Sequence, residues 1–154
     1  MEFLRFKHAR FSARFPRDYR YSASHYWMAP EGEMPGLWRV GFTKFATRML
    51  GELVEATFDL PLGTKIAAGE EIGAVEGFKA ASSVFSVIDG TFEGLNPVIE
   101  ADACVVKSDP YEVGWLYRAR GEPEEGNLDA EGYLRLLEAT ITRMAAMEHG
   151  ESGA

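Results

Sequence analysis

The sequence predicts a mainly β protein with a short internal helix and a C-terminal helix. Residues 72–76 alternate in the period-2 pattern of a half-buried strand. Residues 84–88 read Val-Phe-Ser-Val-Ile, a run of the β-branched and aromatic side chains that favour strands. Helical spacing of apolar residues recurs in two segments, after Thr43 and after about Asp129. With 154 residues and 46% hydrophobic content, the chain is long enough for one domain with its own core.

The N-terminus differs in charge from the rest of the chain. The first twenty residues hold six basic and two acidic side chains, a net charge of +4 that leaves −12 for the remainder. An arginine-rich, acid-poor start is typical of a transit peptide. The alternation over residues 11–15 instead favours an edge strand with its basic side chains outward. We favour the strand over residues 1–17, a basic extension, because four aromatic side chains need a core: Phe3, Phe6, Phe11 and Phe15.

Strands and one helix are expected over the next forty residues. Residues 21–28 form a predicted strand with an aromatic face, residues 30–36 a turn, and residues 37–42 a second strand. Thr43 fits the N-cap of a short helix that ends near Gly51, a C′ residue. The apolar face of that helix is expected to contain Phe42, Phe45, Ala46, Met49 and Leu50.

The second half of the chain continues the sheet and ends in a helix. Strands are predicted over residues 52–60, 91–95 and around 115–117, with breaks at Pro61-Leu62-Gly63, Asn96-Pro97 and residues 108–111. We expect residues 18–120 to form the main domain, and residues 121–154 to form a polar linker, 121–127, and a helix packed on that domain. The helix carries one apolar stripe that is expected to dock on the sheets: Tyr133, Leu136, Leu137, Thr140, Ile141 and Met144.

Composition excludes several functions. A net charge of −8 argues against nucleic acid as a partner, and no run approaches the roughly 18 apolar residues of a membrane span. Cys104 stands in an apolar run, so we expect a buried structural thiol. It is also the only cysteine, so we expect no internal disulfide and a cytoplasmic location. The three histidines are scattered without metal-ligand spacing. Neither a metal site nor a set of catalytic residues is therefore expected.

One lysine stands out at the turn between the two strongest strands. Gly77 is suited to the chain reversal, where a positive φ is expected, and Lys79 lies at the tip among small residues. Such a lysine is accessible from many directions, as a covalent attachment point requires. An ordinary solvated turn lysine explains this hairpin about as well, so the hairpin alone leaves both interpretations open.

The surroundings of Lys79 resemble the lipoyl/biotinyl attachment domains. Gly69 and Gly90 lie almost symmetrically about the turn, as in the two similar halves of that fold. The turn itself, Glu76, Gly77, Phe78, Lys79 and Ala80, is similar to the lipoyl form, because the biotinyl form brackets its lysine with methionines. Further segments, which recur in order between Asp18 and Leu116, together resemble the H protein of the glycine cleavage system: residues 20–27, 40–43, 49–52, 60–61, 96–97, 109–111 and 114–116.

The resemblance implies a barrel-sandwich hybrid of two small antiparallel sheets and a carrier protein without turnover of its own. Lys79 would carry lipoic acid in amide linkage, and the arm would shuttle an aminomethyl group between enzymes. The implied partners are a lipoate-attaching enzyme, a glycine decarboxylase, an aminomethyltransferase and a dihydrolipoyl dehydrogenase. Three alternatives are a similar lipoyl carrier for another cargo, such as sulfur, a non-lipoylated interaction module of the same fold, and a biotin acceptor.

The sequence departs from the family pattern near the implied resting cleft of the arm. Tyr26 stands where the family has the acidic residue of a His-Glu-Trp segment, and Ser83 replaces a second acidic residue. Gly77-Phe78 replaces the usual Ser-Val pair ahead of the lysine. We therefore expect the lysine that carries the lipoyl group to be retained, and the polar groups that hold a cationic cargo to be altered. The residues of this cleft are expected to be Ser24, Tyr26, Met49 and Ser83.

Overall fold

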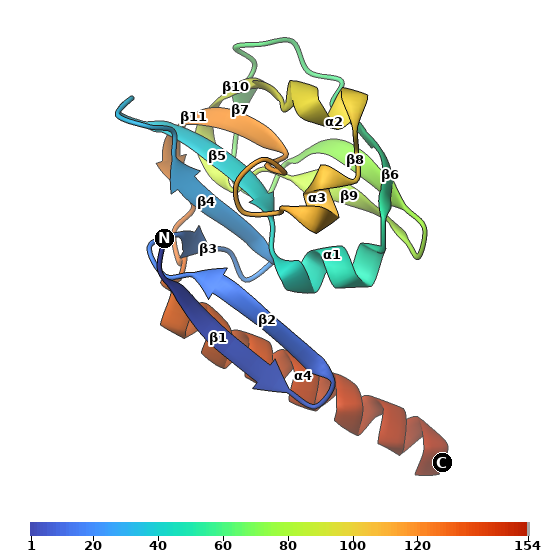
Figure 1. The fold of residues 1–154 in the computed structure, drawn as a ribbon. Helices are drawn as coiled ribbons and strands as arrows, with labels where there is room; N and C mark the ends of the chain where they lie inside the picture. Colours follow the sequence, from blue (N-terminus) through green and yellow to red (C-terminus); the bar gives the residue numbers. More distant parts are fainter. Residues whose placement is uncertain (154) are drawn as a thin grey trace.

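The computed structural model describes residues 1–153, and the side chains of residues 1–148. Its strands form three sheets, and every strand pair is antiparallel (Figure 1). A six-stranded sheet has the order β3 (Arg20–Tyr21), β4 (Tyr26–Pro30), β5 (Leu37–Phe42), β11 (Tyr117–Pro123), β10 (Ile88–Leu95) and β7 (Lys65–Ile66). A three-stranded sheet has the order β6 (Leu53–Thr57), β8 (Glu71–Gly77) and β9 (Ala81–Phe85). The expected mainly β barrel-sandwich class is confirmed.

The main core lies between these two sheets. Apolar side chains from both contribute to it, and several are completely buried: Met28, Val40, Val84, Ile88, Leu116 and Tyr117. Burying such side chains stabilises the fold by roughly 1.5–3 kcal/mol each. The tyrosine in this set also bonds through its hydroxyl, which accepts the backbone N–H of Val87 at 3.2 Å. The link between β9 and β10, residues 86–87, is thereby fixed on β11.

The N-terminal extension is a hairpin rather than an isolated edge strand. β1 (Phe3–His8) pairs with β2 (Phe11–Pro16) in register, with Arg5 opposite Arg14. Because side chains alternate along a strand, Arg5, Lys7 and Arg14 lie on the outer face together with Phe3, whereas the other three phenylalanines lie on the inner face. Phe6, Phe11 and Phe15 are buried, as expected from the sequence, whereas Phe3, which was expected to be buried with them, is only partly buried.

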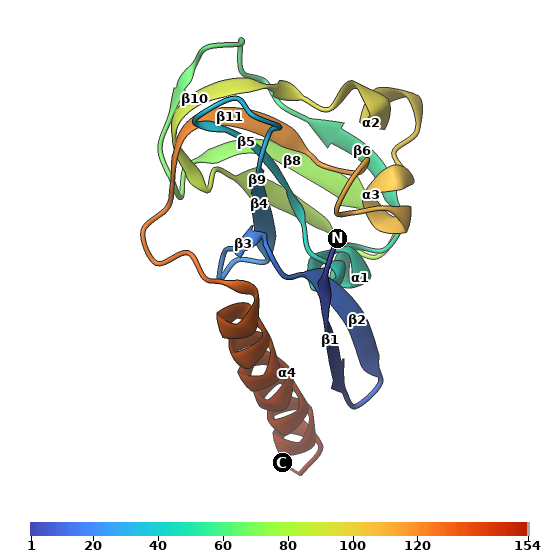
Figure 2. The same cartoon turned by 60° about the vertical axis from the view of Figure 1, so that its left-hand side comes forward.

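The inner face of the hairpin and the C-terminal helix build a second, aromatic core. α4 (Ala130–Gly153) runs beside β1, and both project away from the two main sheets (Figure 2). Tyr133 and Leu137 from the predicted stripe are fully buried, and Tyr133 stacks on Tyr21 at 4.9 Å between ring centroids. The helix thus packs on the hairpin and on the edge strand β3, rather than over the body of the sheets.

The short internal helix forms as predicted, although its buried face differs. α1 (Lys44–Leu50) begins after Thr43, whose side chain accepts the backbone N–H of Ala46 as an N-cap. Thr47 is buried on this helix, whereas Met49 is 50% exposed. Two further short helices, α2 (Pro97–Ala101) and α3 (Val105–Ser108), follow the break at Asn96-Pro97 and were not predicted.

Two predicted elements have different limits. The strand expected over residues 21–28 is divided into β3 and β4, because residues 22–25 turn tightly and His25 has a φ of +73°. The strand around residues 115–117 starts at Tyr117 and continues to Pro123, into the region expected to be a linker. Within the described residues, no helix is long and apolar enough to cross a membrane.

Candidate site for covalent cofactor attachment

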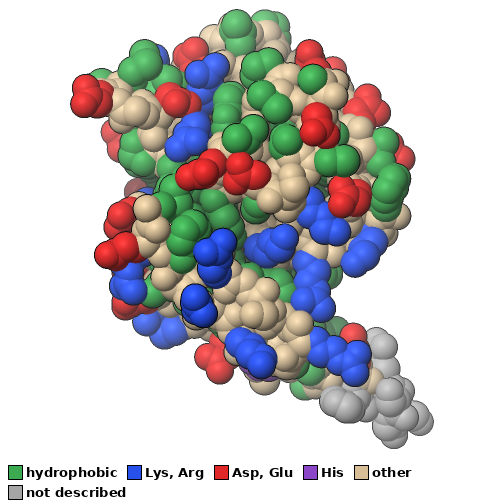
Figure 3. Space-filling model, in the orientation of Figure 1, with side chains coloured by type: hydrophobic (Ala, Val, Ile, Leu, Met, Phe, Trp, Pro, Cys, Tyr) green, Lys and Arg blue, Asp and Glu red, His purple; other side chains and the backbone are tan. Residues whose placement is uncertain are grey.

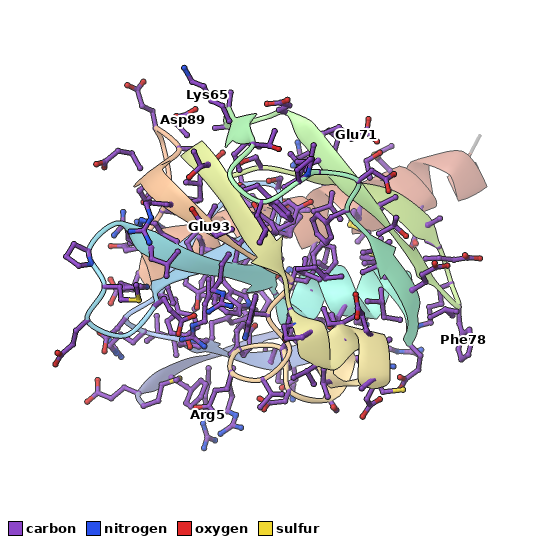
Figure 4. The ribbon with its side chains drawn as sticks, turned by 90° about the horizontal axis from the view of Figure 1, so that it is seen from above. Arg5, Lys65, Glu71, Phe78, Asp89 and Glu93 are labelled. Carbon is purple, nitrogen blue, oxygen red and sulfur yellow. The ribbon has the colours of Figure 1, made fainter. Side chains whose placement is uncertain are left out.

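Lys79 lies in the turn between β8 and β9, at the exposed end of the three-stranded sheet. Its side chain is exposed, and no carboxylate of the described residues forms an ion pair with it. The neighbouring Phe78 is 79% exposed and projects away from the protein at the end of the β8–β9 ribbon (Figure 4). The ε-amine is therefore free to react, and nothing in the described chain needs to be displaced from it.

The backbone of this turn is anchored to the end of α1. The N–H of Lys79 donates to the carbonyl of Leu50 at 3.0 Å, and the N–H of Phe78 donates to the carbonyl of Glu52 at 2.9 Å. The turn is closed by the N–H of Gly77, which donates to the carbonyl of Ala80 at 2.9 Å. Three backbone hydrogen bonds thus hold the tip in place, while Glu76, at the end of β8, remains exposed beside it.

Gly77 is required for a different reason from the one predicted. The expected positive φ is wrong, since this glycine is not among the residues with positive φ. A Cβ on Gly77 would instead overlap the carbonyl oxygen of Leu50, so the residue is small because two backbones approach each other closely. This close approach allows the hydrogen bond from Lys79 to form.

Gly51 is a residue of the site that sequence reasoning missed. It was predicted only as the end of the helix, and its φ of +76° agrees with that position. A Cβ added to Gly51 would also lie 3.0 Å from the Cγ of Lys79 and 3.2 Å from its backbone nitrogen. The base of the lysine side chain therefore rests against this glycine. The available signal was the Leu50-Gly51-Glu52 segment, one of the segments on which the resemblance depends.

Tyr26 is placed inside the main core. It is 3% exposed and stacks on Phe42 with 5.3 Å between ring centroids. Its hydroxyl accepts the backbone N–H of Phe85 at 3.0 Å, and burial raises its pKa. This hydroxyl therefore accepts the backbone N–H of the last residue of β9, two residues beyond Ser83.

Ser83 is engaged by a carboxylate from the neighbouring strand. Its Oγ donates a hydrogen bond to Oε1 of Glu71, and its backbone pairs with Ala74 of β8. A negative charge is thus present next to this position, although it comes from Glu71 rather than from residue 83. Figure 4 shows Glu71 near the end of β8 that lies away from Phe78.

The other two residues of the expected cleft lie on different elements. Ser24 is exposed in the turn between β3 and β4, where its Oγ bonds to Ser22 Oγ at 2.6 Å. Met49 lies on the exposed side of α1, one residue before the carbonyl that holds Lys79. A cleft of about 330 Å³ borders Glu71, between β8 and residues 57–60, but none of the four expected residues lines it.

Cys104 is not the buried structural thiol that its apolar surroundings predicted. It is exposed at the start of α3, because this short helix turns only Val106 into the core. Glu52 and Asp102 lie close to the thiol and raise its pKa, which disfavours the reactive thiolate. Among the described residues, no group of three or more potential ligands could hold a metal ion.

An exposed lysine on an anchored hairpin turn of a barrel-sandwich fold is the arrangement expected of a carrier domain for a covalently attached cofactor. Sequence comparison identifies the carrier more closely. The family model for the glycine cleavage H-protein matches residues 19–139. The glycine cleavage system H protein of Pseudoalteromonas atlantica is 39% identical over 130 residues, which cover 82% of this chain and 98% of that protein. The corresponding protein of Micrococcus luteus is 40% identical over 122 residues, covering 77% and 93%.

A solved structure agrees with these relatives. The crystal structure of a glycine cleavage system H protein from Mycobacterium marinum has a TM-score of 0.68 and 33% identity, and the match covers 77% of this chain and 95% of that one. The chain therefore belongs to the glycine cleavage H-protein family, whose members are non-catalytic lipoyl carriers. The hairpin β1–β2 lies within residues 1–18, which precede the part that the family model matches.

Proposed function

We propose that Lys79 is the residue that carries the lipoyl group, and that the loaded carrier serves glycine cleavage by moving an aminomethyl group between enzymes. The observation that supports this most directly is the free amine on a turn held by three backbone hydrogen bonds. Phe78, Glu76, Gly77 and Ala80 form the rest of that turn. Lys65 and Lys107 are the alternatives; Lys65 lies on β7, and Lys107 forms an ion pair with Glu52 at 3.9 Å.

The residues present fit a lipoyl group in amide linkage. Acylation removes the charge of the amine, and among the described residues Lys79 has no ion pair to lose by it. When bound, the group supplies a dithiolane that accepts electrons and carries cargo on sulfur. The chain itself fixes the root of the arm through Leu50 and Gly51, and leaves the distal carbons of the lysine free to swing. Tethering raises the effective concentration of the cargo at each partner.

The partners that follow from this role are the enzymes with which the carrier exchanges its cargo. As a glycine cleavage H protein, the chain works with the other components of that system. We propose a lipoate-attaching enzyme, a glycine decarboxylase, an aminomethyltransferase and a dihydrolipoyl dehydrogenase as its individual partners. A cytoplasmic location is proposed on the single cysteine, which excludes a disulfide within the chain.

Peptide mapping of the protein after co-expression with a lipoate ligase tests the attachment site. One lipoyl group is expected on Lys79, and none on Lys65 or Lys107. The variant Lys79→Arg should remain unmodified while its free energy of unfolding changes by less than about 0.5 kcal/mol, as for an exposed substitution. Modification of another lysine, or a wild-type protein that the ligase leaves unmodified, would refute the proposal.

A further inference from the structure

The outer face of the added hairpin forms one wall of a cleft of about 840 Å³. Phe3, Arg5, Ser12 and Arg14 line it from β1 and β2, and Lys44 at the start of α1 lines it beside them. Residues 108–112, which connect α3 toward β11, form the opposite wall. This cleft exists because of the hairpin, which the family model does not include.

Arg5 and Arg14 lie side by side on the hairpin wall of the cleft, and no described carboxylate forms an ion pair with either of them. Arg5 and Arg14 are direct cross-strand partners, and like charges in that position destabilise a hairpin. Neither side chain forms an ion pair or a hydrogen bond within the described residues; Arg14 only lies over the ring of Phe3, at 4.7 Å. Their planar guanidinium groups therefore offer unused donors that match carboxylates in geometry. A bound carboxylate would relieve the repulsion between them.

The charge of the surrounding surface indicates what kind of anion fits. Lys and Arg side chains gather over β1, β2 and α1, whereas Asp and Glu dominate the upper part of the same face (Figure 3). Outside the first twenty residues the chain carries −12, which repels an extended polyanion such as nucleic acid. On the opposite wall, Asp109 and Glu112 likewise disfavour a small dense anion in the centre of the cleft. A short acidic segment that lies along the arginine wall pairs with Arg5 and Arg14 and keeps its carboxylates on the side of the cleft away from Asp109 and Glu112.

The cleft is also connected to the proposed attachment site. Lys44, at its edge, starts α1, and Leu50, at the other end of that helix, holds the N–H of Lys79. Seven residues of helix separate the two ends by only about 10 Å. A macromolecule seated on the hairpin would therefore have the swinging arm within its reach.

We infer that the cleft between the β1–β2 hairpin and residues 108–112 is a docking site for an acidic segment of a partner enzyme. The inference rests on the proposed function, because the partner is one of the enzymes that the arm serves. Arg5 and Arg14 bind its carboxylates, and Lys44 adds a third positive charge. The rest of the carrier surface is negatively charged and is repelled by the acidic segment. The carrier therefore approaches its partner with the hairpin first.

Binding of the unmodified carrier to each purified glycine cleavage enzyme of the same organism tests this site. The double variant Arg5→Glu, Arg14→Glu should raise the Kd for at least one enzyme by about tenfold or more. The control Arg10→Glu, Lys65→Glu changes the net charge equally at two exposed positions that do not line the cleft, and should raise the Kd less than about threefold. Only the wild-type and control proteins should lose affinity steeply between about 0.05 M and about 0.5 M salt. Lys44→Glu, on a different element, should weaken binding in the same direction.

Several outcomes would overturn the inference. Equal effects of the two double variants would indicate unspecific electrostatics, and the absence of binding by the wild-type protein would remove the site. Arginine-dependent binding to duplex DNA, to anionic vesicles or to a second copy of this chain would assign the cleft to another occupant. Because the assay uses unmodified protein, its result is independent of lipoylation. If Lys79 is not the lipoylation site, the mass spectrum shows this separately, because Lys79 remains unmodified.

Discussion

The backbone N–H of Lys79 donates to the carbonyl of Leu50, which joins the tip of the β8–β9 hairpin to the end of α1. Leu50 is buried in the main core, so the tip is tied to a residue of that core. An attached cofactor needs both a fixed attachment point and a mobile arm. In Lys79 the held part of the residue would end near Cγ, and the mobile part would begin beyond it. The backbone and Cβ are held by Leu50 and Gly51, whereas the rest of the side chain is exposed.

Gly51→Ala is expected to slow lipoylation of Lys79 by about tenfold or more, because the added methyl group displaces the root of the lysine. It should also lower the free energy of unfolding by about 1–3 kcal/mol, since alanine is strained at a φ of +76°. Gly63→Ala is the matched control, with a φ of +83° and open space around it. Single-turnover modification by a lipoate ligase measures both rates. Equal slowing in the two variants would show that strain alone is responsible.

Tyr26→Phe is expected to lower the free energy of unfolding by about 1–3 kcal/mol, because it leaves the N–H of Phe85 without its acceptor. The lifetime of the cargo on the loaded carrier should stay unchanged, since the hydroxyl is committed to that backbone group. Denaturant unfolding and the rate of ammonia release from loaded protein measure the two effects. Faster release with unchanged stability would mean that the hydroxyl contacts the cargo.

Glu71→Gln is expected to shorten the lifetime of a loaded carrier, because Glu71 supplies the negative charge beside Ser83. Release should accelerate about tenfold for each 1.4 kcal/mol of lost interaction with a cationic cargo. Glu76→Gln is the control, since Glu76 is exposed on the same strand. Formaldehyde and ammonia release report the rates. If Glu71→Gln releases cargo no faster than Glu76→Gln, the carboxylate beside Ser83 takes no part in holding it.

Acidification is expected to destabilise the protein through His25. Burial lowers the pKa of His25 below its ordinary 6.5, and Nδ1 shares a 2.8 Å hydrogen bond with the hydroxyl of Tyr133. Because the unfolded chain then binds the proton more readily, unfolding becomes easier as the pH falls below about 6.5. His25→Asn tolerates the positive φ and should flatten this dependence, whereas His8→Asn should retain it. Urea unfolding between about pH 7.5 and pH 5 measures the slopes. Parallel slopes for wild type and His25→Asn would assign the effect to other groups.

Much of the fold was predictable because its elements have clear local signals. The period-2 alternation around Lys79, the N-cap at Thr43 and the apolar stripe after Asp129 each indicated the correct element. Local patterns could not predict where close contacts between distant backbones occur. Gly77 was therefore expected to adopt a special φ, although its constraint comes from Leu50, which is 27 positions away.

The surroundings of Lys79 were predicted less well than the strand–turn–strand segment on which it lies. Cys104 stands in an apolar run, but one turn of helix buries only Val106 and leaves the thiol outside. The loss of a carboxylate at residue 83 was visible in the sequence, whereas its replacement by Glu71 depends on the pairing of β8 with β9. Side-chain partners across a sheet follow from register, which a single sequence does not fix at an irregular pair.

Helix α1 is shared by the two cores, because Phe45 belongs to the aromatic core and Leu50 to the main core. The aromatic core is built from the two ends of the chain, β1–β2 and α4, which close on each other over Tyr133. Separation of these two ends would remove the contact of Phe11 with Phe45 and expose one side of α1. Amide hydrogens in α1 and at the lysine turn should then exchange through the same partial unfolding event. We therefore expect the packing of the two ends of the chain to affect, through Phe45 and α1, how firmly the turn that bears Lys79 is held.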